Sequence, residues 1–144
     1  MSDQQVALKI QKGIRQSEDT IVLAIQTALD ERDYPTSGRD KLEESQFRNL
    51  VRVSDTTEST EVVKNFLRYQ VGRERKWGRG KQSLAEQIIQ DIDGLLKQTA
   101  QDIAIEVGHS NDQPLRKAVH IELIRRYLGY GARHLKYLNS KREG

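Results

Sequence analysis

The chain has 144 residues, 35% of them hydrophobic and 31% charged, and its formal net charge is +3. This length and balance suit one folded domain and exclude a disordered chain, and the lack of cysteine excludes disulfides, thiol catalysis and cysteine metal sites. No apolar run approaches the ~20 residues of a membrane span and no basic-then-apolar leader opens the chain, so we expect a cytoplasmic protein without a membrane partner.

Apolar residues at helical spacing predict helices through the first third of the chain. A short first helix is expected over residues 6–14, and Ser17 is a candidate N-cap for a second helix that ends near Glu31. Residues 32–41 contain Pro35 and Gly38 and therefore predict a loop.

Two further helices are expected over residues 42–53 and 59–71, with a turn and cap region between them from Ser54. Ser59, at the start of the second of these helices, is a candidate cap. Gly72 stands where a helix C-terminus favours glycine, and residues 73–82 predict a basic loop. The side chains expected to face inward are Phe47, Leu50, Val51, Val62, Val63, Phe66 and Leu67.

The second half predicts two long helices. The capping-box sequence from Ser83 to Glu86 starts one that runs to about Val107, and Asp112 with Pro114 starts the last one. A packed seam in the last helix is formed by Ile121, Ile124, Leu128, Gly131, Leu135 and Leu138. We therefore predict an all-α fold, a single-domain antiparallel bundle of five or six helices. In it, residues 1–41 are an N-terminal extension plus loop and residues 42–138 are the helical core.

Charge is segregated along the chain: the net charge is −4 over residues 1–63, +6 over 64–81, −5 over 82–115 and +6 over 116–144. The first basic block interleaves its cations with three aromatic residues and three glycines. Cations neutralise phosphates, aromatic rings stack on bases, and glycines let a backbone approach closely. The composition of the block therefore favours a nucleic-acid surface. The alternative is a charged helix end and a flexible loop whose aromatic residues belong to the core.

The second basic block lies on the last helix, where Arg126 and Arg133 share a face and Lys136 follows one turn later. It favours a row of phosphate contacts, with a solvated helix flank as the alternative. Gly129 and Gly131 permit either close helix packing or the approach of a nucleic-acid backbone. The candidate RNA-binding residues are Arg48, Arg52, Lys64, Arg68, Arg73, Arg75, Lys76, Arg79, Lys81, Arg125, Arg126, Arg133 and Lys136.

The sequence carries no catalytic or metal-binding pattern that we can identify. His120 and His134 are separated by roughly 21 Å along a helix, too far to share one metal ion. The glycines from Gly72 to Gly80 lack the strand-then-helix setting of a phosphate loop. We therefore expect no enzymatic activity, no metal site and no cofactor.

Three stretches resemble the small all-helical subunit of type III CRISPR–Cas effector complexes. The segment from Ser45 to Leu50 is similar to an early Ser-Gln motif followed by an apolar residue and arginine. The segment from Leu67 to Arg73 resembles a central Tyr-x-x-Gly-Arg element, and residues 126–137 resemble an aromatic, basic last helix. At Gly129-Tyr130 the chain departs from the Glu-Ala pair of that family.

The resemblance implies a non-catalytic subunit that stacks with other effector-complex subunits and contacts the crRNA–target RNA duplex through its backbone. The matched basic positions are Arg48, Arg73, Arg126 and Lys136. The other candidate cations depend on the charge argument alone.

Two alternatives stay open at this point. One is a helical adaptor or homodimer that uses the seam of the last helix and pairs its charge blocks head to tail. The other is a DNA-binding regulator in which residues 42–71 form two helices of a helix-turn-helix.

Overall fold

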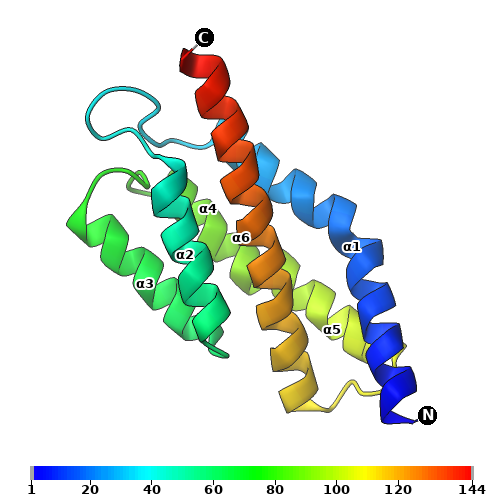
Figure 1. Cartoon of the computed structure of the whole chain (residues 1–144). Helices are drawn as coiled ribbons and strands as arrows, with labels where there is room; N and C mark the ends of the chain where they lie inside the picture. The colour runs from blue at the N-terminus through cyan, green and yellow to red at the C-terminus, as the bar shows by residue number, and fades with distance from the viewer. Residues whose placement is uncertain (1, 144) are drawn as a thin grey trace.

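The computed structural model describes residues 2–143, which form five antiparallel helical rods (Figure 1). These are α1 (Asp3–Glu31), α2 (Glu44–Thr56), α3 (Thr60–Arg73), the continuous rod of α4 (Leu84–Asp91), η1 (Ile92–Leu96) and α5 (Lys97–Glu106), and α6 (Gln113–Glu143). The predicted all-α bundle is confirmed. Within residues 2–143 the only bridge of β type joins Asp33 to Ser83, and no helix is both long and apolar enough to cross a membrane.

The last helix, α6, crosses the middle of the bundle between α1 and α2 (Figure 1) and also packs on α5. Its predicted seam is confirmed, since Ile121, Ile124, Leu128, Gly131 and Leu135 are buried and Leu138 is partly buried. The burial of this seam explains why α6 holds its position despite a strongly polar flank.

The two helices expected in residues 6–31 are one helix, α1, so the predicted cap at Ser17 is wrong. The Ser17 hydroxyl instead donates to the carbonyl of Ile14 at 2.8 Å, inside the helix. The N-cap is Ser2, which accepts a hydrogen bond from the Gln5 backbone. Because α1 buries Ile14, Ile21, Ile25 and Leu29 against the other helices, it belongs to the core rather than to an extension.

The hairpin of α2 and α3 follows the predicted pattern with shifted ends. Helix α2 continues past Ser54 to Thr56, while Ser59 caps α3 as predicted, accepting from the Val62 backbone at 3.3 Å. Gly72 does not end α3, which runs to Arg73. Val62 was expected inward but is 46% exposed, because the buried stripe of α3 is formed by its neighbours Val63 and Leu67.

The rod of α4, η1 and α5 begins and ends as the sequence predicts. Ser83 accepts a hydrogen bond from the Glu86 backbone at 3.1 Å, and Gly108 adopts φ +79 just beyond the last turn. The Asp112 carboxylate likewise caps α6 by accepting from the Leu115 backbone at 3.1 Å. The π-helical turn η1 has no counterpart in the prediction.

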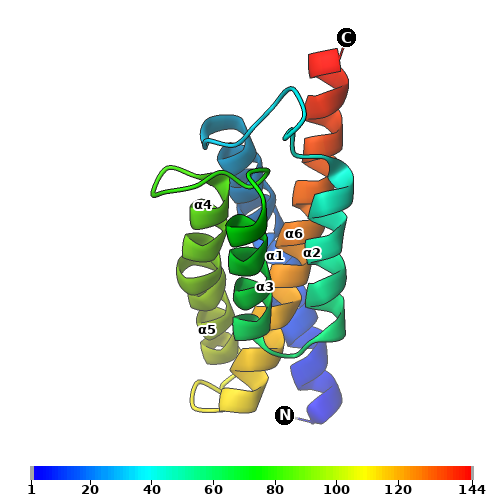
Figure 2. The same cartoon turned by 90° about the vertical axis from the view of Figure 1, so that its left-hand side faces the viewer.

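Two long loops, residues 32–43 and 74–83, lie at the same end of the bundle, as Figures 1 and 2 both show. They are joined by main-chain hydrogen bonds at Asp33, to Gln82 and Leu84, each 3.0 Å. A β-carbon on Gly78 would lie 2.2 Å from the Asp33 carbonyl oxygen, so only glycine permits this approach. Residues 74–82 thus form a loop, as predicted, which is hydrogen bonded to its neighbour, while Arg73 belongs to α3.

Candidate nucleic-acid interface

Lys64, a predicted RNA contact, is buried inside the bundle. Its ammonium group lies 2.7 Å from Asp93 and 3.0 Å from Glu61. Burial alone would lower the pKa of Lys64, but its hydrogen bonds to the two carboxylates outweigh this and raise it. The structure therefore does not bring Lys64 together with the exposed cations.

Arg125 is also engaged within the protein. Its guanidinium donates to the carbonyl of Ser54 at 2.8 Å and to that of Thr57 at 3.0 Å. These carbonyls belong to the last turn of α2 and the residue beyond it, where a helix leaves its acceptors unpaired. Arg125 therefore fastens the C-terminal end of α2 to α6.

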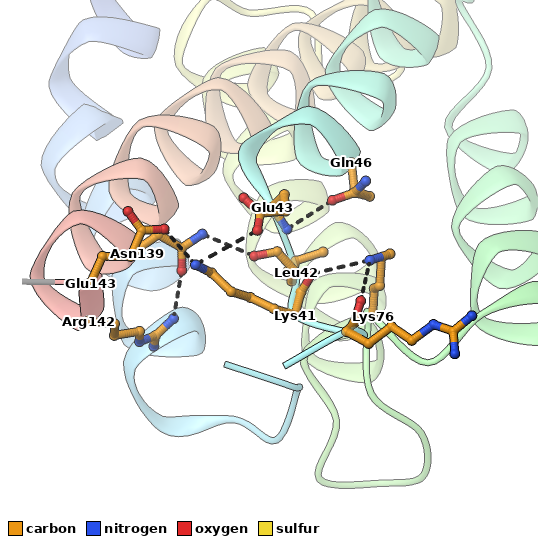
Figure 3. Close-up of polar contacts among 9 residues, drawn as sticks. Lys41, Leu42, Glu43, Gln46, Lys76, Asn139, Arg142 and Glu143 are labelled. Carbon is orange, nitrogen blue, oxygen red and sulfur yellow. Dashed lines mark hydrogen bonds and ion pairs between the residues drawn. The ribbon is translucent and has the colours of Figure 1, made fainter. Parts of the chain in front are cut away.

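Lys76 connects the two long loops (Figure 3). Its ammonium group donates to the carbonyls of Lys41 at 3.3 Å and Arg39 at 3.4 Å. Close by, the buried amide of Asn139 donates to the carbonyl of Leu42 at 3.0 Å. This network fixes the 32–43 loop against α6, and Lys76 belongs to it.

Arg126 is partly exposed and partly neutralised. It lies 3.2 Å from Glu122 and 3.6 Å from Glu18, which also accepts a 2.8 Å hydrogen bond from the Tyr130 hydroxyl. Burial acts to lower the pKa of Arg126, but the hydrogen bond to Glu122 and the partner Tyr130 raise it overall. The positive charge of Arg126 is therefore partly neutralised within the protein, by Glu18 of α1 and Glu122 of α6.

Two of the remaining cations, Arg48 of α2 and Arg133 of α6, lie at the same level along the bundle. Two contacts fix the register of these antiparallel helices, one between Leu42 and Asn139 and the other between Ser54 and Arg125. Arg48 lies halfway along the chain from Leu42 to Ser54. The stretch of α6 around Arg133 lies halfway from Arg125 to Asn139, so it is level with Arg48.

These cations also face the same way. Asp55 shares a face of α2 with Arg52 and Arg48, which precede it by three and seven residues. Asp55 lines a shallow depression of about 570 Å³ together with Gly129 and Arg133 of α6. The exposed cations on these two helix faces, named here the α2–α6 surface, are Arg48, Arg52, Arg133 and Lys136.

Carboxylates offset part of this charge, since Asp55 and Glu122 line the depression itself and Glu44 lies beside Arg48. Arg48 forms an exposed ion pair with Glu44 at 2.9 Å, a contact that water screens and that a phosphate can displace. Within residues 2–143, no ion pair joins Arg52, Arg133 or Lys136 to a carboxylate.

The two glycines of α6 have different roles. A β-carbon on Gly131 would lie 2.6 Å from the Phe47 ring and 2.8 Å from Ile25, so this glycine permits close helix packing. A β-carbon on Gly129 would have no neighbour within 4 Å, and this residue forms part of the floor of the α2–α6 depression. Of the two explanations that the sequence left open, close helix packing applies to Gly131 and does not apply to Gly129.

A second group of cations lies at the loop end of the bundle. Arg32, Arg75 and Arg79, named here the loop surface, line an open depression of about 620 Å³ that also includes Asp33. Arg32 follows α1 and was missed by sequence reasoning, because only the pairing of the two loops brings it beside residues more than forty positions away.

The other predicted cations lie outside these two surfaces. Arg68 and Lys81 are exposed, and Arg73 lies with its guanidinium 6.0 Å from the centre of the Tyr69 ring. Of the three aromatic residues in the first basic block, Tyr69 is 57% exposed, whereas Trp77 is buried against Phe47. Only Tyr69 therefore presents a free ring edge to solvent beside a cation.

No cluster of three or more metal-ligating side chains occurs within residues 2–143. Comparison of the chain with protein-family models, with curated proteins and with solved structures gives no match.

Proposed function

We propose that the protein is a non-catalytic RNA-binding scaffold subunit of a type III CRISPR ribonucleoprotein, in contact with the backbone of the crRNA–target RNA duplex. The observation that carries the proposal is the α2–α6 surface, where cations from two helices face solvent. One of them, Arg133, lines the depression that also includes Gly129 and the carboxylates of Asp55 and Glu122. The resemblance of three segments to the small subunit of such complexes supports the choice of assembly.

The chemistry of the surface suits phosphates rather than bases. Its charged groups are arginines and a lysine on rigid helices, and arginine binds phosphate oxygens in pairs. Contacts to the backbone position a duplex without reading its sequence. Such contacts fit an assembly in which guide pairing supplies the specificity, and its other subunits are the expected protein partners.

The fold lacks the features on which the homodimer and helix-turn-helix alternatives depend. The seam that a homodimer was expected to use is buried between α1, α2 and α5 of the same chain. Helices α2 and α3 lie side by side as an antiparallel hairpin in both views, without the wide crossing angle of a helix-turn-helix (Figures 1 and 2). Self-association through other surfaces stays compatible with the proposal.

The direct test measures binding of two RNA duplexes of unrelated sequence by fluorescence anisotropy at several salt concentrations. We expect similar affinities for both duplexes and a linear fall of log K with log salt. Replacing Arg133 by glutamine should weaken both affinities equally, whereas Lys9→Gln, which removes one charge from an exposed part of α1 beside a different groove, is the matched control. A loss confined to one sequence, or one equal to that of the control, contradicts the proposal.

The choice of assembly has its own test. A tagged protein purified from its native host should bring down CRISPR repeat-derived RNAs and large effector subunits. Recovery of the chain free of nucleic acid, alone or with copies of itself, would overturn the assignment and favour an adaptor role.

A further inference from the structure

The groove between α5 and α6 contains a basic pocket that the proposed RNA surfaces do not include. It has a volume of about 290 Å³ and lies in the half of α6 nearer its N-terminus, away from the two long loops. Every charged side chain in its lining is a cation, and the lining contains no carboxylate. Its polar and basic residues are Lys97, Gln101, Gln113, Arg116, Lys117 and His120.

The cations of this pocket are unpaired. Within residues 2–143, no ion pair joins Lys97, Arg116 or Lys117 to a carboxylate, whereas the buried Lys64 of α3 has two such partners. The Nε atom of Arg116 is buried and has no hydrogen-bond acceptor. The protein therefore supplies neither a carboxylate for the Arg116 guanidinium nor an acceptor for its Nε, so an anion at the part of the side chain that lines the pocket would be stabilising.

His120 adds a group whose protonation responds to an anion. Its Nε2 lies 2.7 Å from the carbonyl of Ile92, the first residue of the π-helical turn. Because a carbonyl only accepts, Nε2 carries the proton, and Nδ1 is left to take a second one. This contact orients the ring at the wall of the pocket.

Burial, assisted by neighbouring cations, lowers the pKa of His120 and so favours the neutral ring. Burial lowers its pKa below the ordinary 6.5, and the cations Lys97 of α5 and Lys64 of α3 lower it further. The carbonyl of Ile92 and the carboxylate of Asp93 on η1 act in the opposite direction. An anion beside Lys97 would offset that cation and favour the protonated ring.

We propose that the α5–α6 pocket binds a phosphate group, held by Arg116, Lys97 and Lys117 and assisted by His120. A phosphate dianion offers acceptors to several donors at once, which matches a guanidinium, two ammonium groups and an imidazole around one small space. The two glutamine amides of the lining supply neutral donors.

The phosphate comes either from a free nucleotide or from the 5′ end of an RNA, and the chemistry of recognition is the same for both. This inference does not depend on the RNA-scaffold proposal, because the pocket shares no residue with the α2–α6 surface or the loop surface. Each can therefore fail alone.

Isothermal titration calorimetry with inorganic phosphate, and with sulfate as a dianion that does not titrate in the working range, tests the site on the full chain. We expect saturable binding at one site that weakens roughly tenfold or more in Arg116→Gln, which removes charge-assisted hydrogen bonds. Lys141→Gln, an equal loss of charge at the far end of α6, should bind as the parent protein does.

Sulfate binding should also tighten as the pH falls from about 7.5 to about 5.5, because protonated His120 adds a donor. The His120 ring resonances should shift on titration, which provides a second readout if Arg116→Gln folds poorly. Binding that is absent, or that is the same in Arg116→Gln and Lys141→Gln with no response of His120, overturns the inference.

The two sources of the phosphate are distinguished by comparing the binding of AMP with that of a short RNA carrying either a 5′-phosphate or a 5′-hydroxyl. An Arg116-dependent preference for the 5′-phosphorylated RNA assigns the pocket to an RNA end. Binding of AMP with no Arg116-dependent difference between the two RNAs assigns it to a free nucleotide. Either result supports the phosphate pocket, and neither bears on the α2–α6 surface.

Discussion

The guanidinium of Arg125 on α6 donates a 2.8 Å hydrogen bond to the main-chain carbonyl of Ser54, in the last turn of α2. Its neighbour Arg126 turns to Glu122 and Glu18, and Arg133, on the same face of α6 as Arg126, faces solvent. Cations from one basic stretch thus divide between holding the fold together and facing solvent. This division yields predictions that separate stability from affinity.

Replacing Arg125 by alanine should lower the free energy of unfolding by about 1–3 kcal/mol, because it leaves the carbonyls of Ser54 and Thr57 without their donor. Urea unfolding followed by circular dichroism measures the change. Arg133→Ala, which removes an exposed side chain from the same helix, should change stability by less than about 0.5 kcal/mol. Equal losses in the two variants would show that Arg125 has no special structural role.

In RNA binding, the two variants should rank in the opposite order, with the larger effect in Arg133→Ala than in Arg125→Ala. Arg133→Ala should weaken binding of duplexes of any sequence and reduce the slope of log K against log salt by about 1, the signature of one lost phosphate contact. Arg125→Ala should leave this slope nearly unchanged, since its charge is already engaged by main-chain carbonyls and Glu58. A slope that does not respond to Arg133→Ala would remove this residue from the interface.

The two glycines of α6 provide a matched test of packing. Gly131→Ala should destabilise the protein by about 1–3 kcal/mol, because the new methyl group would overlap the Phe47 ring and Ile25. Gly129→Ala should stabilise it by up to about 1 kcal/mol, because its methyl group meets open space within a helix. Thermal unfolding of both variants decides the matter, and a stabilised Gly131→Ala would contradict the packing described here.

The fold was predictable from the sequence where the signals are local and agree with each other. Ser59, Ser83 and Asp112 each cap a helix as expected, and the α6 seam is buried as its spacing indicates. Each of these features needs only residues within one or two turns. Helical spacing together with a cap is therefore sufficient for most of the bundle.

The structure differs from the sequence-based prediction where tertiary packing, rather than the local sequence, decides between two backbone conformations. Ser17 is as good a cap as Ser59 by residue type, but a continuous buried stripe through Ile14 and Ile21 keeps α1 unbroken. The π-helical turn likewise has no local signal, although His120 binds its first carbonyl from another helix. Such choices depend on partners many residues away.

The candidate interface was predictable as a set of cations but not as a geometry. Lys64 and Arg133 are both cations, and only the packing that places Lys64 beside Asp93 and Glu61 buries one of them in ion pairs. Conversely, Arg32 joins Arg75 and Arg79 because two loops are hydrogen bonded through Asp33. Charge segregation indicates where cations are abundant, and the packing determines which of them face solvent.

A buried polar pair gives a prediction on pH. The hydroxyl of Tyr127 donates to Asp91 at 2.6 Å, and the Gln87 amide donates to the other carboxylate oxygen at 2.8 Å. Burial raises the pKa of Asp91 above its ordinary 3.8, while these hydrogen bonds and the charge of Arg32 oppose the shift without cancelling it. The folded protein therefore holds this proton to a higher pH than the unfolded chain does.

The sign of the effect on stability follows from that difference. Stability is lost as the pH rises from about 3.9, the unfolded value, through the raised pKa of folded Asp91, and the loss is complete above it. Asp91→Asn keeps an oxygen that accepts from Tyr127 and cannot ionise, so it avoids this loss. The stability of Asp91→Asn relative to the parent protein should therefore increase with pH between about 4 and about 7, measured by urea unfolding at each pH. Tyr127→Phe should act in the opposite direction, because it removes a donor that stabilises the ionised carboxylate, and a pH-independent difference in both variants would refute the role assigned to Asp91.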